Sequence, residues 1–288
     1  MKKLHLLLLF CSSLFISCSK NSDNPILDPV QVGNSFATEK TLLNVSYGSS
    51  NQQVFDLFLP ANRSSATKTV IVIHGGGWTG GDKTDMDGLL QLLKTNMPTY
   101  AFANINYRLA TTGNPALPMQ IDDISSVISN LKSNNYGISN KFGFVGISAG
   151  AHLSMLYGYA NNSQNEIKAV CSIVGPSNFT DPNYLNSPSL SSLYLAVAGQ
   201  TYAQNPTFFL NASPYHKATA TSPPTLLLYG NADPLVPITQ GQDMNAKLNQ
   251  LGVYNEFTLY NGGHGNWSQP DLLNAYTKII TFMNSKLN

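Results

Sequence analysis

The chain carries little charge. Only 11% of its 288 residues are Asp, Glu, Lys or Arg, and its formal net charge is +1. With so few basic residues, the chain has no basic footprint for nucleic acid, which excludes that class of partner. Hydrophobic residues make up 42% of the sequence, enough to bury a large core. This composition excludes an intrinsically disordered protein.

Metal-ligand and cofactor motifs are also missing. No group of His, Cys, Asp and Glu residues has metal-ligand spacing, and there is neither a phosphate-binding loop nor a dinucleotide fingerprint. We therefore expect no metal and no cofactor. Cysteine is scarce as well, and Cys171 stands alone in an apolar run, residues 167–174. We expect it to be an unreactive core residue without a disulfide.

A nearly unbroken apolar run covers residues 4–16, directly after Met1-Lys2-Lys3. The run is too short to span a bilayer comfortably, and a small residue and then Cys18 follow it. This arrangement resembles a bacterial lipoprotein signal peptide. In such a leader the cysteine becomes the first residue after cleavage and its thiol carries a lipid.

We therefore expect residues 1–17 to be a signal peptide and Cys18 to be lipidated. Residues 18–36 are rich in Ser, Asn, Asp and Pro, which predicts a flexible tether. The protein would then be an exported, extracytoplasmic lipoprotein held at a membrane. The alternative is an ordinary secretory signal that is cut near Ser17 without lipidation. Which membrane face carries the protein, and its oligomeric state, stay open.

Strand-like and helix-like segments alternate along the body of the chain, residues 37–288. Short apolar, β-branched runs predict strands buried on both faces. They lie at residues 69–73, 100–106, 142–147, 169–174, 225–229 and 256–260. Apolar residues at steps of three and four predict helices over residues 121–131 and 272–283. The expected fold class is α/β, with a mostly parallel central sheet flanked by helices.

Two regions interrupt this alternation. Residues 45–59 alternate around Phe55, Leu57 and Leu59, which predicts an antiparallel hairpin before the parallel sheet. Residues 176–215 mix Pro, Ser and Asn with aromatic residues and contain no clear strand. A stretch of that length without a sheet element predicts a small cap insertion over a site.

Gly146-Ile147-Ser148-Ala149-Gly150 is a Gly-x-Ser-x-Gly pentapeptide. Such a pentapeptide also occurs by chance, but here it lies where a predicted strand becomes a helix. A sharp turn at this point exposes a serine hydroxyl, while the start of the helix offers free N–H groups and the positive end of a dipole. The context indicates Ser148 as a nucleophile.

A partner base follows from chain order. Four histidines lie beyond the leader: His74, His152, His216 and His264. His74 and His152 are ruled out by their places beside the glycine turn and along the helix, and His216 precedes the strand that delivers an acid. Only His264 follows the last predicted strand, in a glycine-rich turn. It is the expected base.

The acid follows by elimination among the carboxylates between the serine and this histidine. They are Glu166, Asp181, Asp233, Asp243 and Glu256. Asp233 lies just beyond the carboxyl end of a predicted strand, where open α/β sheets place their sites. The other reading makes Asp233 a turn residue before Pro234, and Asp181 is the reserve candidate.

Three further features concern charged residues and the glycine-rich turn. His74 and Trp78 are expected to shape this turn, and Asp82 either pins it by hydrogen bonds or is a solvated turn residue. Arg108 is expected to pair with a nearby carboxylate for structural reasons. Asp122 and Asp123 fall in the first turns of a helix, where negative charge suits the dipole.

Together these motifs resemble the carboxylesterase group of α/β-hydrolases. They are His74-Gly75-Gly76-Gly77-Trp78, Asn106-Tyr107-Arg108-Leu109, Gly146-Ile147-Ser148-Ala149-Gly150-Ala151-His152, Asp233 and His264. The chain is similar to hormone-sensitive-lipase-like esterases and to acetylxylan and feruloyl (BD-FAE-like) esterases over about residues 40–288. The resemblance implies an α/β-hydrolase fold and a Ser148, His264 and Asp233 triad. It also implies an oxyanion hole formed by the N–H groups of Gly76, Gly77 and Ala149.

The resemblance also implies a serine carboxylic-ester hydrolase that works through an acyl-enzyme. Expected substrates are small esters or acylated glycans carrying short acyl or hydroxycinnamoyl groups, since an export signal favours a carbohydrate-linked substrate. A serine peptidase or an arylformamidase is the alternative, because the same fold and triad host amide chemistry. An inactive hydrolase homologue that binds glycan or protein is the alternative of another class.

Overall fold

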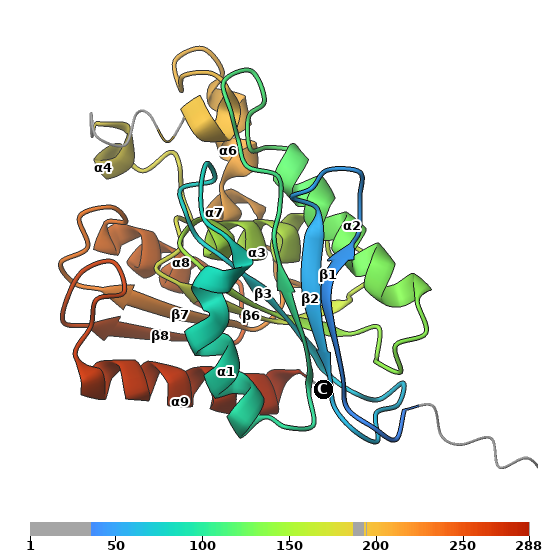
Figure 1. The fold of residues 1–288 in the computed structure, drawn as a ribbon. Helices are drawn as coiled ribbons and strands as arrows, with labels where there is room; N and C mark the ends of the chain where they lie inside the picture. The colour runs from blue at the N-terminus through green and yellow to red at the C-terminus, as the bar shows by residue number, and fades with distance from the viewer. Residues whose placement is uncertain (1–35, 187–192, 194, 288) are drawn as a thin grey trace, which may run out of the picture. The chain divides into compact units, whose positions relative to one another are not determined.

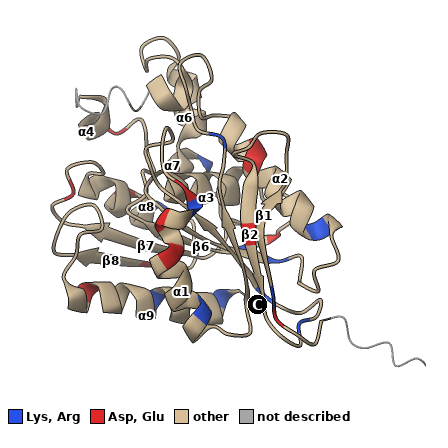
Figure 2. Ribbon diagram, viewed as in Figure 1, with Lys and Arg blue, Asp and Glu red and all other residues tan. Residues whose placement is uncertain are grey.

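The computed structural model describes residues 36–186, 193 and 195–287. The predicted signal peptide, Cys18 and nearly all of the predicted tether lie outside these residues. Residues 35–288 form one compact unit. Within the described part, no helix combines the length and apolar character needed to cross a bilayer. Lys, Arg, Asp and Glu residues are scattered over many elements of this unit and do not gather on one of them (Figure 2).

An eight-stranded sheet forms the centre of the unit, in the order β1-β2-β4-β3-β5-β6-β7-β8 (Figure 1). The strands are β1 (Lys40–Ser46), β2 (Val54–Leu59), β3 (Thr69–Ile73), β4 (Ala101–Ile105), β5 (Phe142–Ile147), β6 (Ile167–Ile173), β7 (Thr225–Gly230) and β8 (Asn255–Tyr260). β1 pairs with β2, and β2 with β4, in antiparallel fashion, whereas the pairs from β4 to β8 are parallel. The predicted hairpin, strands and parallel sheet are confirmed, with the ends of the parallel strands shifted by at most two residues. The hairpin begins at Lys40, five residues before the predicted start.

Helices cover both faces of this sheet (Figure 1). They are the 3-10 turn η1 (Lys83–Met86), α1 (Asp87–Asn96), α2 (Met119–Ser133), α3 (Ala149–Ala160), α4 (Pro182–Leu185), α6 (Pro206–Ala212), α7 (Pro214–Lys217), α8 (Ile238–Gln250) and α9 (Gln269–Lys286). The buried residues of α1 and α9 pack in one apolar cluster, and those of α2, α3 and α8 pack in a second cluster across the sheet. Helix α1 was not predicted, because it has only ten residues and carries a glycine in its first turn.

The buried central strands β3 and β5 determine where the predicted site residues come together. Every residue of β3 is buried, as are five of the six in β5, since both faces of these strands are covered by helices. In a parallel sheet the carboxyl ends of neighbouring strands meet at one edge. The loops after β3, β5, β7 and β8 therefore come together there.

The segment between β6 and β7 is an insertion that carries α4, α6 and α7, and its described residues contain no strand. It is fastened to the core by backbone bonds, for example from the N–H of Tyr215 to the carbonyl of Ser177 over 2.9 Å. Phe209 and Tyr184 of the insertion are buried in the apolar cluster that also holds α3. The insertion is thus packed against the sheet's helices by its aromatic residues.

Candidate active site

Ser148 stands at the turn between β5 and α3. Its φ is 53° and its ψ is −119°, a backbone conformation that residues other than glycine rarely adopt. A Cβ on Gly146 would lie 2.4 Å from the carbonyl oxygen of Gly150, and one on Gly150 would lie 2.2 Å from that of Ile73. Because neither position has room for a side chain, glycine on both sides of the turn permits this backbone. The result is the strained strand-to-helix turn that the pentapeptide predicts.

The loops after β7 and β8 bring an acid and a base to this serine. Nε2 of His264 lies 2.9 Å from Oγ of Ser148, and Nδ1 of the same ring lies 2.7 Å from Oδ2 of Asp233. The carboxylate accepts the proton on Nδ1, which leaves the lone pair of Nε2 facing the serine hydroxyl. The three residues that the sequence selected, separated by up to 116 positions, thus form one connected chain of hydrogen bonds.

The Asp233 carboxylate is fixed from both sides. Its Oδ1 accepts the backbone N–H groups of Leu235 at 2.8 Å and Val236 at 2.9 Å, while Oδ2 is left for the imidazole. The carboxylate side chain has no exposed surface, whereas 21% of the His264 side chain is exposed. A buried, fully hydrogen-bonded carboxylate can hold the ring in one orientation, and the partly exposed ring can reach a substrate.

The histidine loop is fastened to the acid loop. A Cβ on Gly230 would lie 2.2 Å from the carbonyl oxygen of Gly263, so the two loops approach closely at a glycine. Oδ1 of Asn231 accepts the N–H of Gly262 at 3.0 Å, and Oδ1 of Asn266 accepts that of Gly263 at 2.9 Å. Neither asparagine was selected from the sequence. Their positions, two residues before the acid and two residues after the base, are the only signal that pointed to them.

The glycine-rich loop after β3 lies directly beside the serine. A Cβ on Gly75 would lie 3.2 Å from Cβ of Ser148. The next two residues have positive φ, +108° at Gly76 and +58° at Gly77, and a Cβ on Gly76 would lie 2.1 Å from the carbonyl oxygen of Gly80. Among the described residues, no hydrogen bond outside the helices and strands uses the N–H of Gly76, Gly77 or Ala149. The loop therefore keeps backbone donors next to the hydroxyl.

A hydrogen bond between Trp78 and His152 links this loop to α3. Nε1 of Trp78 donates to Nδ1 of His152 over 3.2 Å, so the proton of this ring lies on Nε2, which is 2.8 Å from the carbonyl oxygen of Ala212. His152 is fully buried, and burial lowers its pKa to about 4. His74 is also fully buried, and its ring stacks on Tyr107 with centroids 4.2 Å apart. These two histidines and Trp78 have structural places, as the sequence predicted for His74 and Trp78.

Asp82 holds the turn after the glycine-rich loop by hydrogen bonds and is not merely a solvated turn residue. Its carboxylate caps η1 through the N–H of Thr84 at 2.9 Å and accepts the amide of Asn106 at 2.7 Å. Burial raises its pKa, but these hydrogen bonds outweigh burial and lower the pKa to about 2. The turn that follows the glycine loop is therefore tied to the end of β4.

A buried ion pair that the sequence did not reveal holds the same turn. Nζ of Lys83 lies 2.8 Å from Oδ2 of Asp56 on β2, and the two side chains are only 9% and 12% exposed. The backbone of Lys83 is bonded as well, from its N–H to Oδ1 of Asn106 and from Nδ2 of Asn104 to its carbonyl. A lysine beside a glycine turn gives no sign of its burial in sequence, because the aspartate that pairs with it comes from another strand.

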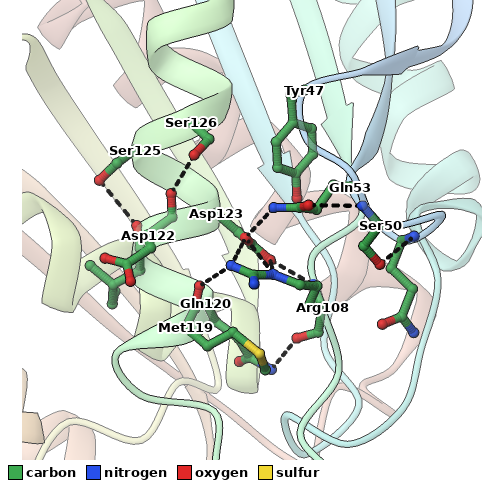
Figure 3. Close-up of polar contacts among 12 residues, drawn as sticks. Tyr47, Ser50, Gln53, Arg108, Met119, Gln120, Asp122, Asp123, Ser125 and Ser126 are labelled. Atoms are coloured by element: carbon green, nitrogen blue, oxygen red, sulfur yellow. Dashed lines mark hydrogen bonds and ion pairs between the residues drawn. The ribbon is translucent and has the colours of Figure 1, made fainter. Parts of the chain in front are cut away.

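Arg108 forms the structural ion pair that was expected, with Asp123 of α2 (Figure 3). Its Nη2 lies 2.6 Å from Oδ1, Nε contacts both carboxylate oxygens, and the amide of Gln53 donates to Oδ1 at 2.8 Å. Asp123 is fully buried, so its main interaction is this pair and not the helix dipole. Gln120 extends the network toward the glycine loop, because its Nε2 donates to the carbonyl oxygens of Trp78 and Arg108, both at 2.8 Å.

The remaining candidates lie away from the serine's hydrogen bonds. The reserve acid Asp181 caps α4, and its Oδ2 accepts from Thr239 at 2.6 Å and Gln240 at 2.8 Å. His216 contacts Oγ1 of Thr180 at 2.9 Å. Cys171 is free and fully buried, and burial raises the pKa of its thiol, as expected of an unreactive core residue.

Comparisons with known proteins agree with this architecture. Esterase LipC of Mycobacterium tuberculosis is 26% identical over 242 residues, which cover 77% of this chain and 59% of LipC. The isoprenylcysteine alpha-carbonyl methylesterase ICME of Arabidopsis thaliana is 23% identical over 244 residues, which cover 79% of this chain and 57% of ICME. The chain thus spans less than two thirds of the length of these relatives.

Solved structures match more of the chain. A truncated carbohydrate esterase from gut microbiota superposes with a TM-score of 0.70 at 22% identity, over 86% of this chain and 98% of the other. The thermostable carboxylesterase EstE1, from a metagenomic library, gives the same TM-score at 17% identity, over 89% and 92%. At such identities the likeness concerns the fold. The BD-FAE family model matches residues 55–248, and the chain therefore belongs to the BD-FAE family and has the α/β-hydrolase fold.

Proposed function

We propose that the protein is a serine carboxylic-ester hydrolase that uses Ser148, His264 and Asp233 as a catalytic triad. The observation that carries the proposal is the continuous hydrogen-bonded chain from Oγ of Ser148 through the His264 ring to a buried Asp233. Esterase relatives and esterase structures of the same fold support it.

The proposed reaction begins when Nε2 of His264 takes the proton of the Ser148 hydroxyl as Oγ attacks the ester carbonyl. Asp233 holds the ring in its orientation and stabilises the imidazolium. The carbonyl oxygen becomes an oxyanion that accepts N–H groups of Gly76, Gly77 and Ala149. When the carbon–oxygen bond to the alcohol breaks, His264 returns its proton to the departing oxygen and an acyl-enzyme remains.

Water completes the cycle. His264 takes a proton from a water molecule, the hydroxide oxygen attacks the acyl carbon, and the proton then passes to Oγ of Ser148 as the acid departs. Loss of one oxyanion donor typically lowers turnover by about 10² to 10³. The glycine-rich loop is therefore expected to contribute as much to the rate as a catalytic side chain.

We propose short acyl or hydroxycinnamoyl esters of carbohydrates as substrates. The carbohydrate esterase of the same fold supports this class, as does the predicted export of the chain.

We also propose that the thiol of Cys18 anchors the protein to a membrane through lipid. A Cys18→Ser variant should then leave the membrane fraction, and its retention there would argue against the anchor.

The triad is tested with purified residues 19–288 and p-nitrophenyl acetate. We expect hydrolysis by the unchanged protein and its loss in Ser148→Ala and in His264→Ala. Activity retained in either variant would contradict the assignment. Faster cleavage of a dipeptide anilide or of formylkynurenine than of any ester would favour the amide-hydrolysing alternative. Failure of a fluorophosphonate probe to label Ser148 would favour an inactive binding protein.

A further inference from the structure

Lysines gather at the edge of the sheet where the parallel strands begin, which we call the amino edge. Ser148 lies at the opposite edge, beyond the last residue of β5. Strand β1 begins at the amino edge too, because β1 and β4 are both antiparallel to β2. Four lysines are the first or second residue of a strand or directly precede one: Lys40, Lys68, Lys141 and Lys168.

The helices that return from the opposite edge also end in lysine. α1, α2, α8 and α9 each carry one in the last turn, namely Lys94, Lys132, Lys247 and Lys286. Their other ends differ, since α1, α2 and α9 have an aspartate in the first turn, and Figure 2 shows α2 red near its start and blue near its end. Within the described strand starts and helix ends of this edge, the acidic residues are Glu39, Glu166 and Glu256. Eight lysines thus face three carboxylates, a local excess that the low net charge of the chain conceals.

The lysines form a continuous band. Lys94 and Tyr100 line one cavity of about 260 Å³. Nζ of Lys68 lies 5.6 Å from the centre of the Tyr100 ring. Lys68 and Lys141 in turn line a second cavity of about 340 Å³. Lysines of α1 and of the segments before β3 and β5 therefore adjoin one another.

The second cavity suits a negatively charged group. Besides the two lysines, its described lining offers the hydroxyls of Ser65 and Ser139 and the amide of Asn140, and none of these residues is acidic. Next to it, burial and the charge of Lys141 lower the pKa of Lys168. These two ammonium groups repel each other, and an anion between them would relieve the repulsion.

Local roles account for only half of the band. A lysine in the last turn of a helix interacts favourably with the helix dipole, and Lys132 also pairs with Glu166. The four lysines at the strand starts have no helix to stabilise. None of the eight lysines is buried, so all of them can act on charges outside the protein.

The described chain also begins at the amino edge. A Cβ on Gly137, in the turn between α2 and β5, would lie 2.9 Å from the ring of Phe36, and the Arg63 guanidinium lies 5.0 Å from the centre of that ring. Residues 18–35 precede Phe36, so Cys18 is joined to the compact unit at this edge. A fully extended chain from Cys18 to Phe36 spans at most about 65 Å. A lipid on Cys18 would therefore hold the amino edge near a bilayer.

We propose that the amino edge is a membrane-binding surface, whose lysines lie against the anionic headgroups of a bilayer. The attachment of the predicted lipid anchor at this edge favours a bilayer over a soluble polyanion. Ser148 is about 20 Å away, the length of β5. The site would then open away from the membrane. The proposal goes beyond the esterase function and does not depend on it.

The test uses residues 19–288, which lack Cys18 and contain the whole compact unit. Binding is measured by co-sedimentation with vesicles of two parts phosphatidylcholine to one part phosphatidylglycerol, and with vesicles of phosphatidylcholine alone. We expect binding to the anionic vesicles at about 0.05 M salt and its loss at about 0.5 M, because salt screens exposed charges. Binding to the neutral vesicles should be at least about tenfold weaker.

Two double variants with the same change of net charge locate the surface. Lys68→Gln with Lys141→Gln should weaken binding to the anionic vesicles about tenfold or more. The matched control is Lys217→Gln with Lys278→Gln. Lys217 lies in the insertion and bonds to Asn211, and Lys278 lies about 12 Å before Lys286 along α9. We expect the control to bind as the unchanged protein does, and Lys68→Arg with Lys141→Arg to restore binding. Circular dichroism and melting temperatures show which variants are folded.

A measurement on the unchanged protein avoids any question of folding. Lysines are acetylated with and without anionic vesicles, and the modified positions are identified by mass spectrometry. We expect vesicles to slow the acetylation of Lys40, Lys141 and Lys168 and to leave that of Lys217 and Lys278 unchanged.

Equal binding to both kinds of vesicle, equal losses in the two glutamine variants, or protection of Lys217 and Lys278 instead would overturn the proposal. Tighter binding of heparin than of the anionic vesicles would assign the edge to a soluble polyanion and would also overturn it. Hydrolysis of p-nitrophenyl acetate should be the same in all variants. Vesicle binding by a protein that hydrolyses no ester would contradict the proposed function alone.

Discussion

The indole N–H of Trp78 donates a hydrogen bond to Nδ1 of His152, and the opposite nitrogen of that ring contacts the carbonyl oxygen of Ala212. One buried imidazole thus connects the glycine-rich loop, the helix that follows Ser148, and α6 of the insertion. The ring can make both bonds only as the neutral tautomer with its proton on Nε2. Protonation of Nδ1 would place its N–H opposite the indole N–H of Trp78, and two donors cannot form a hydrogen bond.

This geometry predicts that stability falls at acid pH. Burial lowers the pKa of His152 to about 4 in the folded chain, whereas a histidine in an unfolded chain has a pKa of about 6.5. Between these values the unfolded state binds more protons, so the free energy of unfolding decreases as the pH falls from about 6.5 to about 4. This residue alone accounts for a decrease of up to about 3 kcal/mol. Burial of His74 acts in the same direction.

The measurement is urea unfolding of the unchanged protein and of His152→Gln at several pH values from 7.5 to 4.5. Glutamine keeps an amide that can bond Trp78 but does not titrate. We expect the variant to be less stable at pH 7.5 and to lose less stability on acidification. The slope of its unfolding free energy against pH should be smaller by the contribution of one proton. An identical slope in both proteins would show that His152 is not the group responsible.

The glycines of the serine turn give a second prediction. A Cβ on Gly150 would lie 2.2 and 2.3 Å from the carbonyl oxygens of Ile73 and His74, all of which are backbone atoms that cannot move alone. Gly150→Ala should therefore separate the glycine loop from the serine turn, with a loss of several kcal/mol in unfolding free energy and of most ester hydrolysis.

Gly88 in α1 is the matched control. A Cβ there meets nothing within 4 Å, and the residue is exposed in a helix. Gly88→Ala should leave ester hydrolysis unchanged and stabilise the protein by about 0.5–1 kcal/mol, because alanine favours helix. Thermal unfolding and p-nitrophenyl acetate assays measure both. Equal stability of the two variants would mean that the turn has room that the structure does not show.

The two glycines also illustrate what the sequence could predict. Ser148, Asp233 and His264 were found from chain order, because the topology of a parallel sheet fixes which loops share an edge. The glycine-rich loop was found through the family motif His74-Gly75-Gly76-Gly77-Trp78, in which glycine leaves room beside the backbone donors. Helix α1 was missed because Gly88 weakens its local signal, and it forms since Leu90 and Leu93 are buried against the sheet.

Outside the site, the partners in contacts between distant segments were the part that the sequence could not predict. The Lys83 and Asp56 pair joins positions on two segments, and no local pattern marks either residue as buried. Asp123 was assigned to the helix dipole, which is a local rule, but its carboxylate is covered by Arg108 and Gln53 from other segments. Pairings of this kind depend on the folded arrangement and have no periodicity or spacing that could reveal them.

The buried ion pair gives a third prediction. Lys83→Met would leave the Asp56 carboxylate buried with, among the residues that the structure describes, only the N–H of Asn44, 2.7 Å away, as its hydrogen-bond donor. Removing one partner of a buried pair typically costs about 3–5 kcal/mol. Because Lys83 fixes the turn after the glycine loop, we expect a lower kcat for p-nitrophenyl acetate in the molecules that remain folded.

The double variant Lys83→Met and Asp56→Leu distinguishes the pair from its packing. With both charges gone, no unpaired carboxylate is left, and most of the unfolding free energy should return. Urea unfolding of the two single variants and the double variant gives the coupling energy. Strictly additive losses would show that the two residues act independently and that the ion pair does not hold the turn.

The fourth prediction separates the acid at the site from the reserve acid. Asp233→Asn keeps the size of the side chain but replaces the acceptor for Nδ1 of His264 by an amide that can present a donor. The ring can then adopt the other tautomer, whose protonated Nε2 cannot take the proton of Ser148. A change of this kind lowers kcat by about 10⁴ in a serine triad. Substrate binding, and hence KM, should change little.

Asp181→Asn is the comparison. Its carboxylate accepts from Thr239 and Gln240 and has no hydrogen bond to His264, so kcat should stay within a fewfold of the unchanged protein. Stopped or continuous assays with p-nitrophenyl acetate at neutral pH measure both variants, with thermal unfolding to show that each is folded. A large loss of kcat in Asp181→Asn with little loss in Asp233→Asn would reassign the acid. The two aspartates lie on different loops. While the bond from Asp233 to His264 persists, Asp181 therefore cannot replace Asp233 through a change of its own side chain.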